Sequence, residues 1–84
     1  MAWYLYLIEC EGGSIYTGVA IDVAARYAVH LSGKGARYTR SYRPVRLLMS
    51  MEFADKSSAL KAEYRVKRLS ASEKRAFCRQ HGIC

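Results

Sequence analysis

The sequence has little cysteine, a single proline and half as many acidic as basic residues. Its three cysteines, Cys10, Cys78 and Cys84, contain no CxxC pair, which argues against a zinc site. Three cysteines also do not suit the disulfide framework of a small secreted domain. We therefore expect three reduced thiols, with Cys10 and Cys78 in the core.

Long apolar runs are absent as well. No segment approaches the roughly 20 apolar residues that are needed to cross a bilayer. The apolar start, Met1–Cys10, lacks the basic leading region and the small-residue cleavage site of a signal peptide. We interpret it as a strand and expect a cytoplasmic protein. A chain of 84 residues suits one domain, which we expect to span residues 1–84, with its core over 3–73.

The shortage of acid leaves a strongly basic chain. Seven Asp and Glu face 14 Lys and Arg, which gives a formal net charge of +7 and a pI near 9.6. Such a balance is typical of proteins that bind nucleic acid. The alternative is a basic protein whose charge merely keeps it soluble.

Three segments have the composition of strands. Residues 3–8 are aromatic and β-branched, and residues 14–18 return after the turn signal Glu11-Gly12-Gly13. These two segments predict a hairpin. Residues 45–53, rich in Leu, Val and Met, predict a third strand.

The first helix is predicted over Val23–Leu31, with Asp22 as its cap. Apolar side chains recur on it at helical spacing and should face the core. These are Val23, Ala24, Tyr27 and Leu31. Residues 32–35 end the helix, and residues 36–43 are expected to form a basic loop that Pro44 closes.

Asp55 is predicted to cap a second helix over residues 56–69. Its expected buried stripe consists of Ala59, Ala62, Val66 and Leu69. The capping-box pattern of residues 70–73 predicts a third helix over about 71–80, with Gly82 at its end. The fold class is therefore α+β, in the order β-β-α-β-α-α: a three-stranded, antiparallel-type sheet flanked by helices.

Five side chains have the chemistry of a catalytic site, namely Tyr6, Tyr16, Arg26, His30 and Glu63. The two tyrosines lie on the two arms of the hairpin, so their phenols can meet on one sheet face. Arg26 and His30 are one helical turn apart. Each residue also has an ordinary explanation: strand tyrosines are usually core or rim aromatics, helical Arg and His are usually solvated, and Glu63 can pair with Lys67 at i+4.

As a set, these residues resemble the GIY-YIG endonucleases. Tyr16-Thr17-Gly18 corresponds to the second motif of the family, with Thr in place of the usual Ile or Val. Arg26 and His30 follow at the family's spacing, and Glu63 lies in the second helix, where the family keeps its metal-binding Glu. The segment 32–39 is similar to the small stand-alone bacterial branch. The first motif departs from Gly-Ile-Tyr and reads Tyr4-Leu5-Tyr6; we assign its tyrosine to Tyr6, with Tyr4 as the rival.

The resemblance implies a metal-dependent DNA endonuclease that leaves a 5′-phosphate and a 3′-hydroxyl. One Mg²⁺ or Mn²⁺ would be held by Glu63 and several waters. Tyr16 or Tyr6 would activate the attacking water, and His30 would take the proton onward. Arg26 would clamp the nonbridging phosphate oxygens.

The basic segment after the first helix suits a surface that follows a nucleic-acid backbone. Its cations are Lys34, Arg37, Arg40 and Arg43, with Tyr38 and Tyr42 between them. Aromatic rings can stack on exposed bases, which favours single-stranded or distorted DNA. The alternative is a solvated loop whose tyrosines pack on the core. For the whole chain, the competing functions are a noncatalytic nucleic-acid-binding module on the same fold and a domain that binds an acidic protein.

Overall fold

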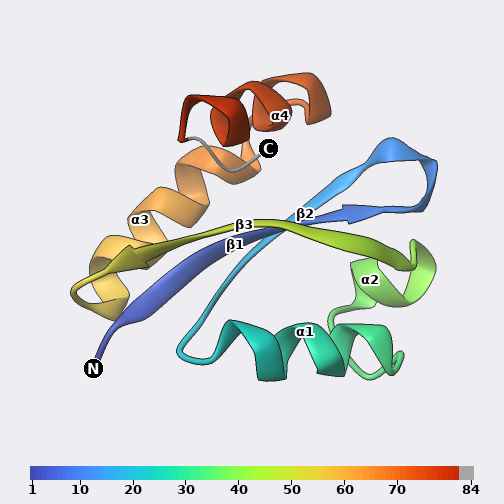
Figure 1. Ribbon diagram of the computed structural model, residues 1–84, viewed down its shortest axis with the longest axis horizontal. Helices are drawn as coiled ribbons and strands as arrows, with labels where there is room; N and C mark the ends of the chain where they lie inside the picture. Colours follow the sequence, from blue (N-terminus) through green and yellow to red (C-terminus); the bar gives the residue numbers. More distant parts are fainter. Residues whose placement is uncertain (82–84) are drawn as a thin grey trace.

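A three-stranded antiparallel sheet forms the centre of the protein. The computed structural model describes residues 1–81, and its sheet has the order β2-β1-β3 (Figure 1). The strands are β1 (Trp3–Cys10), β2 (Ile15–Ala20) and β3 (Pro44–Phe53). A short 3-10 turn, η1 (Glu11–Gly13), joins β1 to β2, and its two glycines have φ of 83° and 86°, which side-chain-bearing residues rarely adopt. The predicted hairpin and the predicted sheet are confirmed.

Four helices complete this α+β fold in the described part of the chain: α1 (Val23–Leu31), α2 (Arg37–Ser41), α3 (Lys56–Lys67) and α4 (Ala71–Gln80). The predicted caps are present. Asp22 accepts a hydrogen bond from the backbone of Ala25 at 3.0 Å, and Asp55 accepts one at 2.8 Å. The capping box at the start of α4 is complete in both directions. Gly82 and Cys84, for which we also made predictions, lie outside the described residues.

The segment 36–43 corrects our prediction of a loop. It contains the short helix α2, in which the backbone of Arg40 donates to Ala36 at 3.1 Å. Its inward-facing Thr39 is buried and bonds to His30 of α1, so a tertiary contact holds this segment in place. Pro44 does not close a loop but begins β3, a position that an edge strand tolerates.

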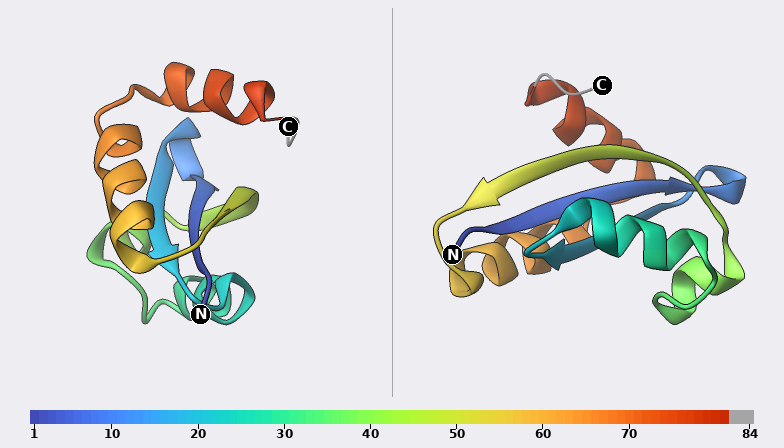
Figure 2. Two further views of the ribbon diagram at one scale, coloured as in Figure 1. Left: turned by 90° about the vertical axis from the view of Figure 1, so that its left-hand side faces the viewer. Right: turned by 60° about the horizontal axis from the view of Figure 1, so that its bottom comes forward.

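The two faces of the sheet carry separate cores. The helices α3 and α4 lie on one side of the sheet and α1 lies on the other (Figures 1 and 2). On one face, Leu5 and Leu7 of β1 pack with α3 and α4. On the other face, Tyr6, Ile8 and Cys10 pack with α1. The helix α3 presents three members of the predicted stripe, since Ala59 and Val66 are buried and Ala62 is partly buried. Leu69 also packs on this core, but α3 ends at Lys67, two residues earlier than predicted. Cys10 and Cys78 are both buried in the core, as predicted.

The buried side of α1 differs from the prediction. Val23 and Tyr27 pack on the core, but Ala24 and Leu31 are exposed, Leu31 to 48%. His30 is buried in their place, with 1% exposure. Positions 23, 27 and 30 form an i, i+4, i+7 stripe, so the helix is rotated towards its histidine. The imidazole tolerates burial because both ring nitrogens have hydrogen-bond partners.

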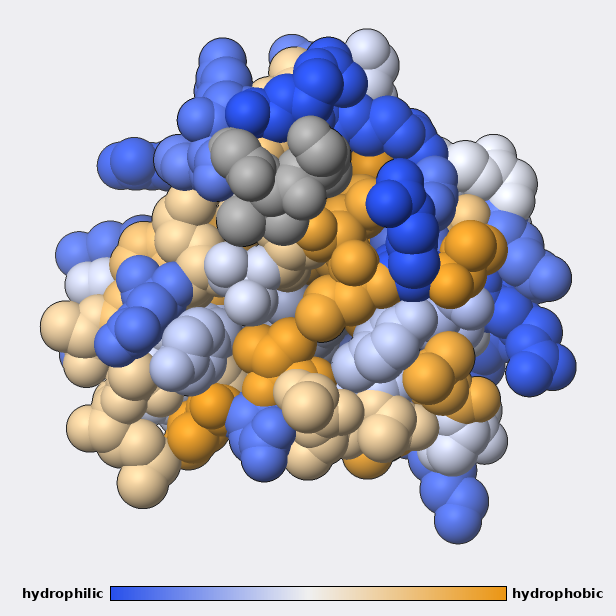
Figure 3. All heavy atoms as spheres, viewed as in Figure 1, coloured by the Kyte–Doolittle hydropathy of each residue, from blue (hydrophilic) through white to orange (hydrophobic). Residues whose placement is uncertain are grey.

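A cluster of charges joins the sheet to α4. Glu9 of β1 bonds to Arg46 of β3 at 2.8 Å and to Arg75 of α4 at 3.0 Å. Hydrogen bonds from Arg46 and then Arg75 lower the pKa of the Glu9 carboxyl. Figure 3 shows a band of apolar side chains near the middle of one face of the protein. Val45 and Leu47, which are 56% and 37% exposed, belong to the same edge strand as Arg46. Within residues 1–81, no helix has the length and apolar composition to span a membrane.

Candidate active site

Two phenols meet on the sheet face that α1 covers. Tyr6 pairs across the hairpin with Gly18, and Tyr16 pairs with Ile8, so the tyrosines are diagonal neighbours with ring centroids 6.3 Å apart. A Cβ atom on Gly18 would lie 2.6 Å from the Tyr6 phenol. Such a contact is too close, so glycine at this position leaves the room that the Tyr6 ring occupies. The Tyr-x-Gly spacing of β2 therefore has a steric reason.

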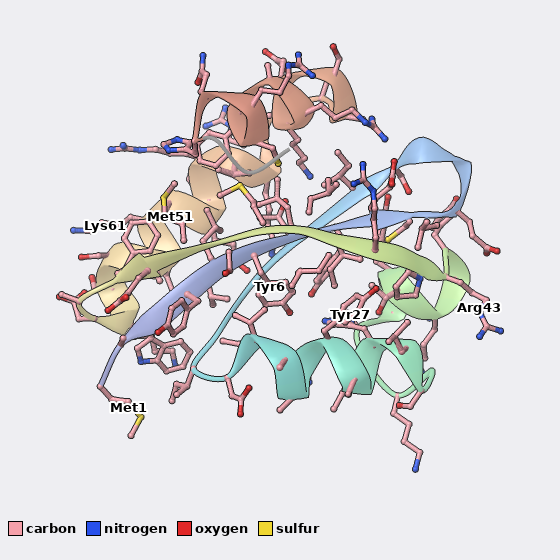
Figure 4. The ribbon with its side chains drawn as sticks, viewed as in Figure 1. Met1, Tyr6, Tyr27, Arg43, Met51 and Lys61 are labelled. Carbon is pink, nitrogen blue, oxygen red and sulfur yellow. The ribbon has the colours of Figure 1, made fainter. Side chains whose placement is uncertain are left out.

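A buried hydrogen-bond chain runs from this phenol to α2. The Tyr6 hydroxyl is 2.9 Å from His30 Nε2, and His30 Nδ1 is 2.7 Å from the Thr39 hydroxyl. Each of the three residues is only 1% exposed. In Figure 4, Tyr6 lies between the sheet and α1, on the same side as Tyr27. Because each of these three side chains has a hydrogen-bond partner, the network holds them in fixed orientations.

Electrostatics keep the buried pair uncharged. Burial, and then the neighbouring Tyr16, raise the pKa of Tyr6 to about 12, although Arg26 acts in the opposite direction. Burial, followed by the charge of Arg26, lowers the pKa of His30. At neutral pH, Tyr6 is therefore a phenol and His30 a neutral imidazole.

Arg26 and Glu63 lie close enough to Tyr6 to influence its ionisation. Arg26 lowers the Tyr6 pKa through a side-chain hydrogen bond and its positive charge, and Glu63 raises it through its negative charge. Arg26 is exposed on α1, one turn before the buried His30, whereas Glu63 comes from α3. Helices from opposite faces of the sheet thus bring one cation and one anion to the same phenol.

The ordinary explanation of Glu63 is also present. Its carboxylate lies 3.5 Å from the Lys67 ammonium, an i, i+4 ion pair, and its side chain is 17% exposed. Such a pair contributes only about 0.3–0.5 kcal/mol, so another cation can replace the lysine. Within residues 1–81, no group of three or more His, Cys, Asp or Glu side chains could hold a metal ion. The donor set fits one metal only as a single carboxylate with a shell of waters, an arrangement that Mg²⁺ tolerates.

The rival tyrosine lies further along β1. Tyr4 pairs with Ala20 on one side and Glu52 on the other, two residues from Tyr6. It lines a hollow with Ile21, Asp22 and Val23 at the start of α1. The described hydrogen bond to His30 comes from Tyr6, which supports Tyr6 as the first-motif tyrosine.

The tyrosines of the basic segment extend the site towards the surface. Tyr38 lies 5.8 Å from Tyr16 and 5.2 Å from Tyr42, measured between ring centroids. Tyr38 is 36% and Tyr42 50% exposed, so they belong neither to the core nor to solvent alone. The cations around them, Lys34, Arg37, Arg40 and Arg43, are all exposed. Figure 4 shows Arg43 pointing away from the body of the protein.

Three residues of the site were not predicted from the sequence: Gly18 as the space for Tyr6, Thr39 as a partner of His30, and Gly35. A Cβ on Gly35 would overlap with His30 Nδ1. The available signal was a small uncharged threonine among arginines and tyrosines, together with a second glycine two residues after Gly33. Neither shows from the sequence which side chain it contacts.

Comparison with known proteins identifies the class. The family model of the GIY-YIG catalytic domain matches residues 2–76, and the chain therefore belongs to the GIY-YIG family. This is a nuclease family that acts on DNA and generally uses divalent metal ions.

Its relatives are small proteins named UPF0213, a stand-alone branch of the family. A UPF0213 protein of Cupriavidus necator is 65% identical over 94% of this chain and 86% of its own length. One from Vibrio cholerae is 45% identical over 89% of this chain and 75% of its own. The solution NMR structure of a UPF0213 protein from Bacillus halodurans is similar with a TM-score of 0.57 and 45% identity, covering 92% of this chain and 82% of that one.

Proposed function

We propose that the protein is a metal-dependent endonuclease that hydrolyses phosphodiester bonds of DNA and leaves a 5′-phosphate and a 3′-hydroxyl. The observation that carries the proposal is that four side chains of different chemistry surround one phenol. Tyr6 lies beside a second tyrosine, a buried histidine, an arginine and a carboxylate. These groups come from β1, β2, α1 and α3, so the fold itself brings them together.

Tyr16 is the better candidate for the base that takes the proton of the attacking water. The Tyr6 phenol is fully buried and already lies against His30 Nε2, whereas Tyr16 is only half-buried at the rim. The water oxygen attacks phosphorus, the bond to the 3′ oxygen breaks, and that oxygen gains a proton. The Tyr6–His30 pair, which is more deeply buried than Tyr16, would take the proton onward. The ring centroids of Tyr16 and His30 are 5.0 Å apart.

Arg26 and Glu63 divide the electrostatic work. Arg26 would bind the nonbridging oxygens through its planar guanidinium, which can make two parallel hydrogen bonds. Glu63 would hold one Mg²⁺ or Mn²⁺ in place of Lys67. The bound ion would supply Lewis-acid stabilisation of the scissile phosphate.

The row Tyr16, Tyr38 and Tyr42 favours single-stranded or distorted DNA. Unpaired bases can stack on these partly exposed rings. Arg37 and Arg40, which flank Tyr38 on α2, would hold phosphates. In an intact duplex the bases are already stacked and offer no free face.

One observation favours a second function, a noncatalytic nucleic-acid-binding module. The Glu63 carboxylate is already paired with Lys67, and a protein that never binds a metal would keep this pair. The module would retain the basic surface and lose the chemistry.

Cleavage is expected to require a divalent cation and Glu63. Glu63→Gln should reduce cleavage in Mg²⁺ to near background on single-stranded, duplex and branched DNA, because the amide keeps the shape but not the charge. The exposed Glu52 provides a matched control, and Glu52→Gln should cut at the wild-type rate. Circular dichroism of both variants checks the fold. Equal rates for Glu63→Gln and wild type would remove the metal site, and a wild-type protein that binds DNA without cutting it would establish the binding module.

DNA binding is expected to be salt-sensitive and weakly sequence-selective. In the double variant Arg37→Gln/Arg40→Gln, the slope of log K against log[salt] should fall by roughly one to two units if both residues contact phosphates. The double variant Arg65→Gln/Arg79→Gln removes the same charge from exposed positions on α3 and α4. If the second variant changed the slope as much as the first, the nucleic-acid surface would not be centred on α2.

A further inference from the structure

The helix α2 has an exposed side and a buried side. Arg37, Tyr38 and Arg40 are exposed, whereas Thr39 is 1% exposed and directed onto His30. A threonine packed in a core needs no partner beyond the local backbone, yet this hydroxyl bridges a backbone carbonyl and an imidazole of another helix. Its position therefore concerns His30 and the site around it.

The hydrogens of this bridge can be assigned by counting. The Thr39 hydroxyl has one hydrogen, and it donates that hydrogen to the Ala36 carbonyl at 3.0 Å. The contact of 2.7 Å to His30 Nδ1 must then have the nitrogen as its donor. In a neutral imidazole the other nitrogen, Nε2, carries no hydrogen and accepts one from the Tyr6 phenol at 2.9 Å.

We propose that Thr39 is a positioning residue that holds His30 in its Nδ1–H tautomer, so that Nε2 stays free to accept the phenolic hydrogen of Tyr6. The tautomer of a histidine is set by the bond that its other nitrogen makes. Gly35 supports the same arrangement, because any side chain there would overlap with the Nδ1 edge of the ring.

The consequence for catalysis rests on the proposed nuclease function. With a bare Nε2, His30 can accept the phenolic hydrogen of Tyr6 while the Tyr6 oxygen takes the proton of Tyr16, so that Tyr6 does not become a phenolate. With the opposite tautomer, Nε2–H points at the Tyr6 oxygen, and His30 can no longer accept a proton from the phenol. One hydroxyl on α2, next to the arginines that would bind DNA, thereby decides the direction of a bond in the buried chain.

The experiment observes the tautomer directly. The chain contains two histidines, His30 and the exposed His81, so the ring nitrogens of ¹⁵N-histidine-labelled protein give two simple patterns at mildly alkaline pH. The variant His30→Asn assigns them, and His81 is an internal control. Wild type should show hydrogen on Nδ1 of His30. Thr39→Ser, which keeps the hydroxyl, should show the same pattern, and Thr39→Val, which has nearly the same shape, should shift the population towards Nε2–H.

Cleavage measured on the same samples completes the test. At saturating DNA, Thr39→Val should be about 10- to 100-fold slower, less than the loss of an acid–base group itself, and Thr39→Ser should recover most of the rate. Hydrogen on Nε2 in wild type would overturn the proposal without any variant, as would a Thr39→Val protein with unchanged pattern or unchanged rate. If wild type cut no DNA, the nuclease function would fail, but the nitrogen spectra would still decide the role of Thr39.

Discussion

The substitution Tyr16→Phe is expected to slow cleavage by about 10²–10⁴-fold at saturating DNA, the usual range for losing a general base. The change removes one oxygen and leaves a ring that can still pack against Tyr6, His30 and Tyr38. Since Tyr16 is half-buried and Phe is apolar, the stability should stay close to that of wild type. Single-turnover cleavage in Mg²⁺, with thermal unfolding of both proteins, measures the two effects separately.

Two matched variants make this result specific. Tyr64→Phe removes the same oxygen from a ring that is 66% exposed on α3, and it should cut like wild type. Tyr6→Phe removes the partner of His30 Nε2 and leaves a buried ring nitrogen unpaired, which costs about 1–3 kcal/mol of folding free energy. If Tyr16→Phe cut normally while Tyr6→Phe was inactive and still folded, Tyr6 would be the base.

The elements that the sequence predicts well are those with local causes. Asp22, Asp55 and Ser70 each cap the helix that follows them, and an aspartate or serine cap acts within three residues. The hairpin likewise depends on the two glycines of the turn between its strands. Such features need no information from distant parts of the chain.

The bounds and the cap of α1 were predicted correctly, but part of its buried face was predicted wrongly, for a non-local reason. Judged alone, Leu31 belongs inside and His30 outside, because an unpaired imidazole is expensive to bury. Thr39 and Tyr6 reverse this preference because together they bond to both ring nitrogens of His30. They lie on α2 and β1, so the sequence around α1 does not reveal them. The helix α2 was missed for the same reason: a segment of basic and aromatic residues gives no helical pattern, and the order comes from the inward contact of Thr39.

The candidate site shows a similar division. Its reactive groups were predicted because phenol, imidazole, guanidinium and carboxylate have distinct chemistry and family spacing. Gly18 and Gly35 have no reactive group, and what they contribute is the space beside Tyr6 and His30. Space of this kind depends on strand register and helix position, which are known only once the chain is folded. The catalytic roles of the site residues remain predictions that the variants test.

The second large effect is expected from Arg26→Ala, which should lower the single-turnover rate by about a hundredfold or more, the scale for losing one donor that stabilises transition-state charge. Arg26 is exposed at the mouth of the site, while its charge acts on both Tyr6 and His30. DNA affinity should fall far less, because 13 of the 14 Lys and Arg remain to supply the attraction to the backbone. Measuring at saturating enzyme separates the two quantities, since weak binding no longer limits the rate.

The controls distinguish position from charge. Arg79→Ala removes an exposed arginine of α4 and should leave the saturated rate unchanged. Arg26→Lys keeps the positive charge but loses the planar fork, so an intermediate rate is expected if two phosphate oxygens are bound at once. A lysine variant as fast as wild type would mean that charge alone suffices. Full recovery of the Arg26→Ala rate at saturation would reduce Arg26 to one more contact with the DNA backbone, because a residue needed only for binding loses its effect once every DNA molecule is bound.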